Sequence, residues 1–508
     1  MEELGNCILK KNDLFELSVD ALGSEGEGIG HLDGFTFFVK DAVPGDKIRA
    51  RVLKIKKNYG YARIEQILTP SPDRVTPRCS VAGPCGGCQL QHLSYEKQLE
   101  YKQQKIQDCL QRIGGITNPN LEPMIGMEEP YYYRNKAQFP VGKGKDGKTA
   151  IGFYAGRTHT IIDSTHCCIQ ARVNEALIAA VRGYLDECRI EPYNEIQHTG
   201  LVRHILTRVG FVTGEIMVCM VINGTSLPKS EILKEKLISA VEEWNRKEKK
   251  DWKKNSDWRK NNEEKERKLI DNNLKKESIK TDNIQYKLTS LCLNINTEKT
   301  NVILGKKVVP LYGETYITDF IGSVKYQISP LSFYQVNPVQ THRLYEQALA
   351  YADLKGGETV WDLYCGIGTI SLFLAQKAKQ VYGVEIVPQA IEDARKNAQL
   401  NKITNAEFFA GAAEEILPQQ YEKSGGAMRA DVIVVDPPRK GCDEELLATI
   451  VKMQPDKVVY VSCDPATLAR DVKYLRENGF EFVKGRGVDQ FGMGGHVETI
   501  VGLQRQDM

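Results

Sequence analysis

The sequence has no long apolar run and no strong excess of charge of either sign. No stretch approaches the roughly 18 consecutive apolar residues of a membrane-spanning helix. The first ten residues, MEELGNCILK, lack the basic segment followed by an apolar segment that marks a secretion signal. Lys and Arg number 68 and Asp and Glu number 66, so the net charge is only +2. These absences predict a soluble, cytoplasmic protein without a membrane partner, and any nucleic-acid surface must be local.

Cysteine is frequent, and its use depends on the compartment. Thirteen cysteines occur in a chain without a recognisable secretion signal. A reducing compartment keeps such residues as thiols or metal ligands rather than as disulfides. At 508 residues the chain is also too long for a single hydrophobic core, so we expect roughly three domains.

Residues 1–70 are predicted to form a small β-barrel, because glycine-rich turns separate short strands. In the strand KIRARV, Lys47, Arg49 and Arg51 alternate with apolar residues, which puts the basic side chains on one face. The alternation reverses after Val52-Leu53, as a β-bulge would produce. Aromatic residues lie among or near the basic ones, which indicates a surface for stacked bases and phosphates. They are Phe35, Tyr59 and Tyr61. An ordinary solvated strand face is the alternative.

Three cysteines form a motif just after this barrel. Cys79, Cys85 and Cys88 have the spacing C-x5-C-x2-C, and two glycines between the last two let the backbone wrap tightly. Three thiolates need a fourth ligand, for which Cys167 and Cys168 in HCCIQ are candidates. We expect an iron–sulfur cubane held by four cysteines. A zinc site and three inert buried thiols are the alternatives, although a second C-x2-C pair is absent.

The middle of the chain mixes helix and strand signals. A charged amphipathic helix is expected over 94–113, and a hairpin over 203–221 turns at Thr213-Gly214. The stretch 130–141 sets aromatics beside basic residues and suggests an RNA face. Residues 245–280 hold fourteen Lys or Arg and eight Asp or Glu with too few apolar residues to bury a core. We therefore expect a disordered or frayed-helix insertion there.

From residue 331 onward strand and helix signals alternate, which predicts a parallel sheet covered by helices on both faces. Strands are expected at 359–364, 381–385, 406–410, 431–436 and 458–462, with two later ones near 480 and 500. Gly366 and Gly368 allow a sharp turn after the first strand and a close approach to a ligand. Glu385, nineteen residues past Gly366, is placed to bind ribose hydroxyls. The third glycine of a dinucleotide motif is replaced by Ser371, which favours S-adenosylmethionine, although this loop alone leaves NAD open.

The strand ends carry the reactive groups. In DPPR (436–439), two prolines fix the turn and free Asp436 to face a ligand. Arg439 stands where enzymes that methylate amines commonly have an aromatic residue, so methylation of carbon is favoured. Uracil C5 is too weak a nucleophile to attack a sulfonium unaided, and a thiolate that adds to C6 solves this problem. Cys463 ends a buried strand in VVYVSCDP, and Glu498 in HVE supplies a carboxylate.

Together these motifs resemble those of the S-adenosylmethionine-dependent RNA uracil-5-methyltransferases. They are most similar to the branch with a TRAM domain and an iron–sulfur cluster, which acts on 23S ribosomal RNA. The resemblance covers nearly the whole chain except 245–280, and its TRAM part is clearest over 26–46. It implies that Cys463 is the nucleophile and that Glu498 is the base that removes the C5 proton.

The resemblance also implies two ligand sets. The 4Fe-4S cluster would be held by Cys79, Cys85, Cys88 and Cys167. A C-x-I-Q pattern aligns Cys167 with the ligand and leaves Cys168 as the spacer. The residues that contact S-adenosylmethionine and uracil would be Gln335, Tyr364, Gly366, Gly368, Glu385 and Asp436.

We therefore expect a multidomain protein that acts as a monomer on RNA, 23S ribosomal RNA first and transfer RNA as the alternative. The expected domains are an OB-like TRAM barrel (1–70), a central mixed α/β iron–sulfur and RNA-binding domain (71–93 and 125–330) and a Rossmann-like α/β methyltransferase domain (94–124 and 331–508).

Two other functions are weighed against this one. A cytosine-C5 RNA methyltransferase would also use a thiolate at C6, but the only Pro-Cys pair lies in the cluster segment. A noncatalytic iron–sulfur RNA-binding module would need neither Cys463 nor Glu498. Three glycines in QFGMGGHVE (490–498) make the loop ahead of Glu498 more flexible than in relatives.

Overall fold

The structure is a computed structural model in which residues 9–144, 146–156, 158–266 and 284–506 are described. It divides into two compact units, one spanning Met1–Tyr131 together with Gln340–Met508 and the other spanning Tyr132–Val339. The first unit therefore joins both ends of the chain, and the second is built from its middle. Within the described ranges, no helix is both long and apolar enough to cross a membrane.

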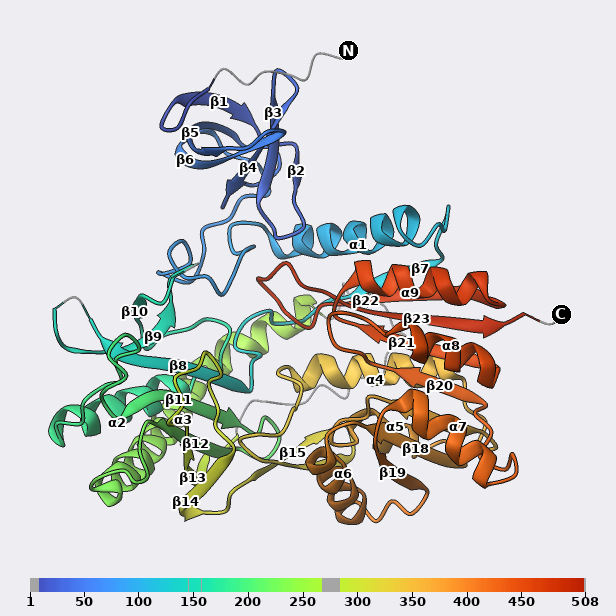
Figure 1. The fold of residues 1–508 in the computed structure, drawn as a ribbon. Helices are drawn as coiled ribbons and strands as arrows, with labels where there is room; N and C mark the ends of the chain where they lie inside the picture. Colours follow the sequence, from blue (N-terminus) through green and yellow to red (C-terminus); the bar gives the residue numbers. More distant parts are fainter. Residues whose placement is uncertain (1–8, 145, 157, 267–283, 507–508) are drawn as a thin grey trace. The chain divides into compact units, whose positions relative to one another are not determined.

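The N-terminal part of the first unit is a curved six-stranded sheet (Figure 1). Its spatial order is β1-β5-β6-β4-β3-β2. The strands are β1 (Leu14–Ser18), β2 (Ala21–Leu22), β3 (Gly28–Leu32), β4 (Phe35–Lys40), β5 (Lys47–Ile55) and β6 (Tyr59–Thr69). β1 also contacts β3, so the sheet curls toward a barrel. Side chains alternate along the strands, and inward ones such as Phe37, Ile48 and Val52 are fully buried.

The C-terminal part of the same unit is an eight-stranded sheet with the order β19-β18-β17-β20-β21-β23-β22-β7. Its strands are β7 (Leu121–Ile125), β17 (Thr359–Leu363), β18 (Gln380–Glu385), β19 (Ala406–Ala410), β20 (Val432–Val435), β21 (Lys457–Ser462), β22 (Phe480–Val488) and β23 (Glu498–Arg505). The strands from β19 to β21 are parallel, and β23 runs antiparallel to β21. All of β20 is apolar and buried, as expected for a parallel strand covered on both faces.

Helices flank this sheet. They are α1 (Tyr95–Arg112), α4 (Pro338–Ala352), α5 (Thr369–Leu374), α6 (Pro388–Leu400), α7 (Ala413–Lys423), α8 (Glu444–Met453) and α9 (Pro465–Glu477). α1 packs beside α9 and contacts β7 and β22, so the segment before the second unit belongs to the α/β layer. Asp464 caps α9, because its carboxylate accepts hydrogen bonds from the backbone N–H groups of Ala466 and Thr467.

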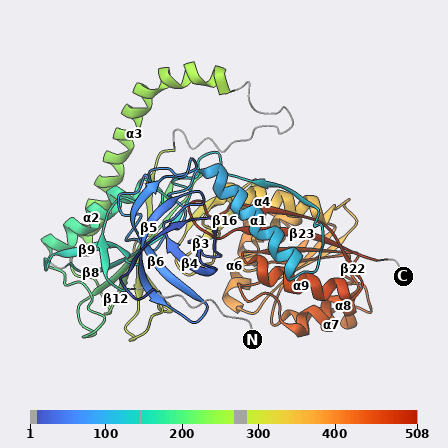
Figure 2. The same ribbon diagram turned by 90° about the horizontal axis from the view of Figure 1, so that it is seen from above.

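The second unit contains a seven-stranded sheet of order β10-β9-β8-β11-β12-β13-β14. Its strands are β8 (Lys136–Lys143), β9 (Thr149–Tyr154), β10 (Ile161–Asp163), β11 (Val202–Val209), β12 (Glu215–Ile222), β13 (Lys287–Ile295) and β14 (Lys307–Gly313). β15 (Ile317–Ile321) and β16 (Val324–Ile328) form a separate hairpin. α2 (Asn174–Glu187) packs against α3 (Ser230–Glu266), and Figure 2 shows that α3 extends well beyond its sheet.

Most expectations for the secondary structure are confirmed. The parallel strands agree with the predicted ranges to within one residue at either end. The register of β5 against β6 shifts between Val52 and Lys54, where the bulge was predicted. β11 and β12 form the predicted hairpin around Thr213. α1 lies within the predicted helix at 94–113.

The charged insertion is the main difference. The prediction was a disordered segment or a frayed helix, and the helical alternative is confirmed for residues 245–266, because α3 continues through Glu266. Residues 267–283 lie outside the described part of the chain. The three predicted domains and their boundaries stay predictions beside the two observed units.

Candidate active site

Four parallel strands end side by side at one edge of the eight-stranded sheet. β17, β18, β20 and β21 run in the same direction, so the residues that end or follow them share the carboxyl edge. These residues are Tyr364, Glu385, Asp436 and Cys463. β23 runs the opposite way, so its first residue, Glu498, lies at the same edge. The fold therefore brings together the sequence-predicted residues of this unit.

A sharp turn connects β17 to α5. Tyr364, Gly366 and Gly368 have φ values of 80°, 55° and 83°, which are left-handed conformations. Glycine adopts this region freely, whereas Tyr364 is strained there, and such strain is typical of functional sites. No atom lies within 4 Å of the position that a Cβ on Gly366 would take, whereas a Cβ on Gly368 would meet the Phe408 ring at 3.2 Å. Gly366 thus leaves open space for a ligand, and Gly368 permits close internal packing.

Glu385 ties this turn to the end of β18. Its carboxylate accepts hydrogen bonds from the backbone N–H of Gly366 at 3.3 Å and of Val387 at 3.0 Å. The next side chain, Ile386, is 68% exposed. An exposed apolar side chain beside a carboxylate suits a ligand with a flat ring and hydroxyl groups. The sequence analysis missed Ile386, because one apolar residue at a strand end carries no motif.

Two carboxyl groups lie close together at the ends of β17 and β20. Asp362 is fully buried and accepts a hydrogen bond from the Ser371 hydroxyl. Burial, with Glu385 nearby, raises the pKa of Asp362 to about 7. Burial and the proximity of Asp362 also raise the pKa of Asp436. A cation bound at this edge would favour the ionised form of both groups. Asp362 was quoted within a motif but not assigned a role from the sequence.

The nucleophile and base candidates come from the antiparallel pair β21 and β23. Ser462 pairs with Thr499, so the next pair along the register is Cys463 and Glu498. Cys463 is half-buried, and Glu498 is only 4% exposed. Burial, reinforced by Glu498, raises the pKa of Cys463 to about 11. Burial and the nearby Asp436 raise the pKa of Glu498. In the free protein the thiol is therefore largely protonated at neutral pH, and ionisation of the carboxyl group is disfavoured.

Arg439 is the cation that opposes these shifts. The guanidinium of Arg439 acts against the burial that raises the pKa of Cys463 and of Glu498. Its Nη2 lies 3.5 Å from Nε2 of His496. Burial and then Arg439 lower the pKa of His496, so this imidazole is neutral at neutral pH. Arg439 can thus stabilise a thiolate at Cys463.

The loop that leads to Glu498 differs from expectation. We call residues 489–497 the base loop. Gly492, Gly494 and Gly495 are all buried, and the Met493 carbonyl accepts hydrogen bonds from the N–H groups of Gln89 at 2.9 Å and Leu90 at 3.0 Å. Residues distant in the sequence therefore hold this loop, although its glycines alone predict flexibility.

Cys79, Cys85 and Cys88 lie in one loop before α1. Burial, with a smaller effect of Cys79, raises the pKa of Cys85, so these two thiols are near each other. Within the described ranges, no three His, Cys, Asp or Glu side chains are arranged as a metal site. Cys167 belongs to the second unit, where it is more exposed than Cys168. Gln335 belongs to that unit as well, and its side chain is buried.

The predicted basic face of the barrel is partly neutralised. Arg49 lies 3.4 Å from a carboxylate oxygen of Glu16, and Arg51 lies 2.9 Å from one of Glu65. Exposed pairs of this kind contribute little stability, but they reduce the net positive charge available to phosphates.

A different set of aromatic rings reaches the outer surface of the barrel. Phe35 is only 6% exposed and packs in the core, so its predicted place near a nucleic-acid surface is wrong. Phe38, Tyr59 and Tyr61 are partly exposed, with ring centroids 5.5 to 6.0 Å apart. Lys54 pairs with Tyr61 across β5 and β6. Rings beside cations suit stacked bases.

Comparison with known families agrees with this architecture. A family model described as tRNA (Uracil-5-)-methyltransferase matches residues 267–506, and the TRAM domain model matches residues 10–64. An uncharacterized RNA methyltransferase of Halalkalibacterium halodurans is 46% identical over 496 residues, which cover 98% of this chain and 98% of the relative. One from Clostridium tetani is 45% identical over 493 residues, which cover 97% and 96%.

A solved structure shares the fold over nearly the whole chain. It is the crystal structure of Pyrococcus abyssi tRNA (uracil-54, C5)-methyltransferase in complex with S-adenosyl-L-homocysteine. The match has a TM-score of 0.70 and 26% sequence identity, and it covers 96% of this chain and 100% of that chain. The TRAM barrel and the Rossmann-like C-terminal domain expected from the sequence are therefore confirmed.

Proposed function

Since the chain belongs to the family of RNA methyltransferases that join a TRAM domain to an RNA uracil-5-methyltransferase domain, we propose that it methylates C5 of a uridine through a covalent adduct on Cys463. The observation that carries this proposal is the register of β21 and β23. It brings a thiol and a carboxyl group together at the carboxyl edge of the sheet, next to Asp436. A covalent nucleophile and a base are the two groups that C5 methylation of uracil requires.

The proposed chemistry assigns one task to each side chain. The Cys463 thiolate adds to C6 of the uracil, and the C5=C6 electron pair moves into an enolate. S-adenosylmethionine supplies the methyl group to C5 and is released as S-adenosylhomocysteine. The ionised Glu498 carboxylate, which Arg439 favours against burial, then removes the C5 proton, and the electron pair left behind re-forms C5=C6 and expels the Cys463 thiolate. Arg439 favours the thiolate at the first and last steps.

We assign the cofactor to the turn between β17 and α5. Open space at Gly366 and the tight packing at Gly368 would let a ligand approach the backbone closely. Glu385 would bind the ribose hydroxyls, with Ile386 along the adenine ring. Asp362 and Asp436 have raised pKa values that a sulfonium cation would lower, so they favour a positively charged ligand.

The other predicted contacts complete this set. Tyr364 stands at the start of the same turn, and its strained backbone conformation supports a ligand-binding role. Gln335 is proposed as a further cofactor or uracil contact on the resemblance alone.

The target that we propose is 23S ribosomal RNA. Its basis is the resemblance of the Cys79–Cys88 loop to the iron–sulfur branch of the family. Transfer RNA is the alternative, because the matching family model and the solved relative from Pyrococcus abyssi are both named for transfer RNA. Mapping 5-methyluridine in ribosomal and transfer RNA from a strain that lacks this chain separates the two targets. A monomer in the reducing cytoplasm remains part of the proposal.

A 4Fe-4S cluster is proposed on Cys79, Cys85, Cys88 and Cys167. The donor set fits a cubane, which takes four cysteine thiolates. Three of the four lie in one short loop, and the influence of Cys79 on the pKa of Cys85 shows that two of these thiols are near each other. No step of the methyl transfer is assigned to the cluster.

The covalent mechanism is tested by separating its two halves. Glu498→Gln should still allow attack and methyl transfer, but the C5 proton would have no base, so the protein should stay attached to methylated RNA. On a denaturing gel, the adduct appears as a slower band that requires both RNA and S-adenosylmethionine. Cys463→Ala should abolish methyl transfer, and the band should vanish in the double variant. Cys109→Ala is the matched control, because Cys109 is a partly buried thiol like Cys463, lies on α1 in the same unit and has no assigned role.

Two results would contradict the mechanism. Methylation of uridine by Cys463→Ala would exclude the covalent route. Normal turnover of Glu498→Gln without a trapped adduct would mean that another group, such as His496, is the base.

A further inference from the structure

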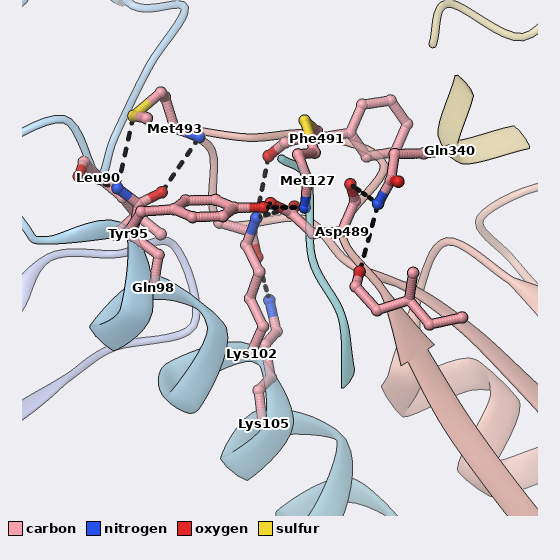
Figure 3. A network of polar contacts seen from close by, with 12 residues as sticks. Leu90, Tyr95, Gln98, Lys102, Lys105, Met127, Gln340, Asp489, Phe491 and Met493 are labelled. Atoms are coloured by element: carbon pink, nitrogen blue, oxygen red, sulfur yellow. Dashed lines mark hydrogen bonds and ion pairs between the residues drawn. The ribbon is translucent and has the colours of Figure 1, made fainter. Parts of the chain in front are cut away.

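A buried ion pair holds the start of the base loop (Figure 3). Lys102 of α1 and Asp489 are both fully buried, and Nζ of Lys102 lies 2.6 Å from a carboxylate oxygen of Asp489. The hydroxyl of Tyr95 donates to the other oxygen at 2.7 Å. The two segments are separated by 387 residues in the sequence. One face of α1 therefore fixes the point where the base loop leaves β22.

The same face of α1 follows the base loop along its length. Lys102 also donates to the carbonyl of Phe491 at 2.9 Å. Gln98 accepts a hydrogen bond from the N–H of Met493 at 3.2 Å, and Lys105 donates to the carbonyl of Gly495 at 3.1 Å. The four contacting residues of α1 follow the i, i+3, i+7 and i+10 spacing of a single helix face. They are Tyr95, Gln98, Lys102 and Lys105. The buried face of a helix is usually apolar, but these four side chains on α1 carry polar groups that contact the base loop.

Burial means that these polar side chains need hydrogen-bond partners within the protein. Gln98 and Lys102 are both fully buried, and a buried polar group without a partner is costly. The base loop supplies partners to both side chains. Met493 has a φ of 67°, an unfavourable conformation for a residue with a side chain, which persists only when its surroundings enforce it. A buried ion pair is weak evidence for added stability, so its more informative consequence is a defined loop path.

We propose that Lys102, supported by Tyr95 and Gln98, is a positioning residue for proton removal from C5. It sets the path of the base loop and hence the position of Glu498 at the loop's end. The inference rests on the proposed function, because it assumes that Glu498 is the base. Cys463 lies between β21 and α9 and is not part of the base loop. Loss of Lys102 should therefore affect the second half of the reaction more than the first.

The size of the effect follows from the geometry of proton transfer. A base must lie within hydrogen-bonding reach of the proton that it removes. A misplacement of about 1 Å can reduce a rate by on the order of 100-fold. We expect Lys102→Met to slow release of methylated RNA by about 10- to 100-fold. Methyl transfer in a single turnover should change by less than about threefold, so the covalent adduct should accumulate.

The experiment uses the full chain, labelled S-adenosylmethionine and an unmethylated RNA fragment that contains the target uridine. Methyl transfer is followed by the label in RNA, and adduct release by the slower band on a denaturing gel. Lys97→Met is the matched control, since Lys97 is on the same helix but exposed and paired with Glu100. Glu498→Gln is the reference for a fully trapped adduct.

The outcomes separate the inference from the function. If Glu498→Gln traps no adduct, the proposed function fails. If Glu498→Gln traps the adduct but folded Lys102→Met releases RNA at the normal rate, the inference is wrong. If Lys102→Met slows both steps equally, the ion pair only stabilises the fold, and the inference is also wrong.

Removal of Lys102 leaves the carboxylate of Asp489 buried without its cation, so this variant can fail to fold. Tyr95→Phe then decides the question, because it removes the hydrogen bond to Asp489, together with the one that the hydroxyl accepts from the N–H of Met127, and keeps the ion pair. It should slow adduct release by about three- to tenfold without a matching loss of methyl transfer. An unchanged ratio of the two rates in Tyr95→Phe would overturn the inference.

Discussion

Replacing Arg439 by Gln should raise the pKa of Cys463 and lower its reactivity at any given pH. Burial and the nearby Glu498 hold the pKa of this thiol near 11, and the guanidinium of Arg439 acts in the opposite direction. Only the thiolate adds to uracil or to an alkylating reagent. Reactivity should therefore rise about tenfold for each pH unit between pH 7 and 10, because this range lies below the pKa.

The magnitude of the change follows from the exposure of Arg439. Solvent screens an exposed charge, so its interaction with one partner is worth on the order of 0.2 to 1 kcal/mol. At 1.36 kcal/mol per pKa unit, this corresponds to a rise of roughly 0.1 to 0.7 unit. The thiolate fraction at a fixed pH below the pKa should fall by about 1.4- to 5-fold. The whole profile should move to higher pH without a change of slope.

The assay is alkylation of the free protein by iodoacetamide between pH 7 and 10, with the Cys463 peptide quantified by mass spectrometry. This readout needs neither RNA nor S-adenosylmethionine, so it isolates the thiol. Lys440→Gln is the control, because Lys440 is the adjacent residue, is exposed and lies 3.6 Å from Asp443. The same variants are then compared in single-turnover methylation with saturating RNA.

An unchanged profile for Arg439→Gln would refute the role of Arg439 in stabilising the thiolate. Reduced methylation with unchanged alkylation would show that Arg439 acts on the RNA instead. An equal shift in Lys440→Gln would mean that the local charge as a whole, rather than Arg439 in particular, sets the pKa.

Three further predictions concern other parts of the chain. Anaerobically purified protein should contain about four irons, and Cys167→Ala should lose iron whereas Cys168→Ala should not; stoichiometric zinc would contradict the cluster. Tyr59→Ala should weaken RNA binding by about 1 to 3 kcal/mol with little change in its salt dependence, because stacking and not charge is lost; equal affinity by filter binding would exclude this face. Burial acts to raise the pKa of Asp46, but hydrogen bonds from Arg74 and from two backbone N–H groups lower it below its usual value. The ionised carboxylate of Asp46 therefore stabilises the fold above the unfolded pKa of about 3.9, and this stabilisation is lost as pH falls through the lowered folded pKa. Asp46→Asn should therefore lower the thermal midpoint at pH 7 and approach the parent near pH 3.

Local patterns in the sequence were enough to predict the elements of the α/β domain. Apolar runs marked the parallel strands, since strands buried on both faces are continuously apolar. The direction of these strands then placed Asp436 and Cys463 at one edge, because consecutive parallel strands share their carboxyl ends. The glycines of the turn at 364–368 were recognisable as well, because only glycine adopts left-handed backbone conformations freely.

The remaining features depended on contacts between segments distant in the sequence. No local pattern indicates that β23 pairs antiparallel with β21 in a register that brings Glu498 to Cys463. Phe35 and Phe38 are the same residue type on the same strand, β4. The pairing of β4 in the barrel decides which of the two rings is buried.

The base loop is the clearest case of a feature that local sequence patterns do not predict. Its glycines predict flexibility, because glycine restricts the backbone least. The tertiary structure instead buries them, and α1 holds the loop, because Lys102 pairs with Asp489 and Lys105 donates to the carbonyl of Gly495. The sequence by itself determined which residues could react and which strands carry them. Only the tertiary structure decided how the base is held, because the hydrogen bonds that hold it join residues nearly 400 positions apart.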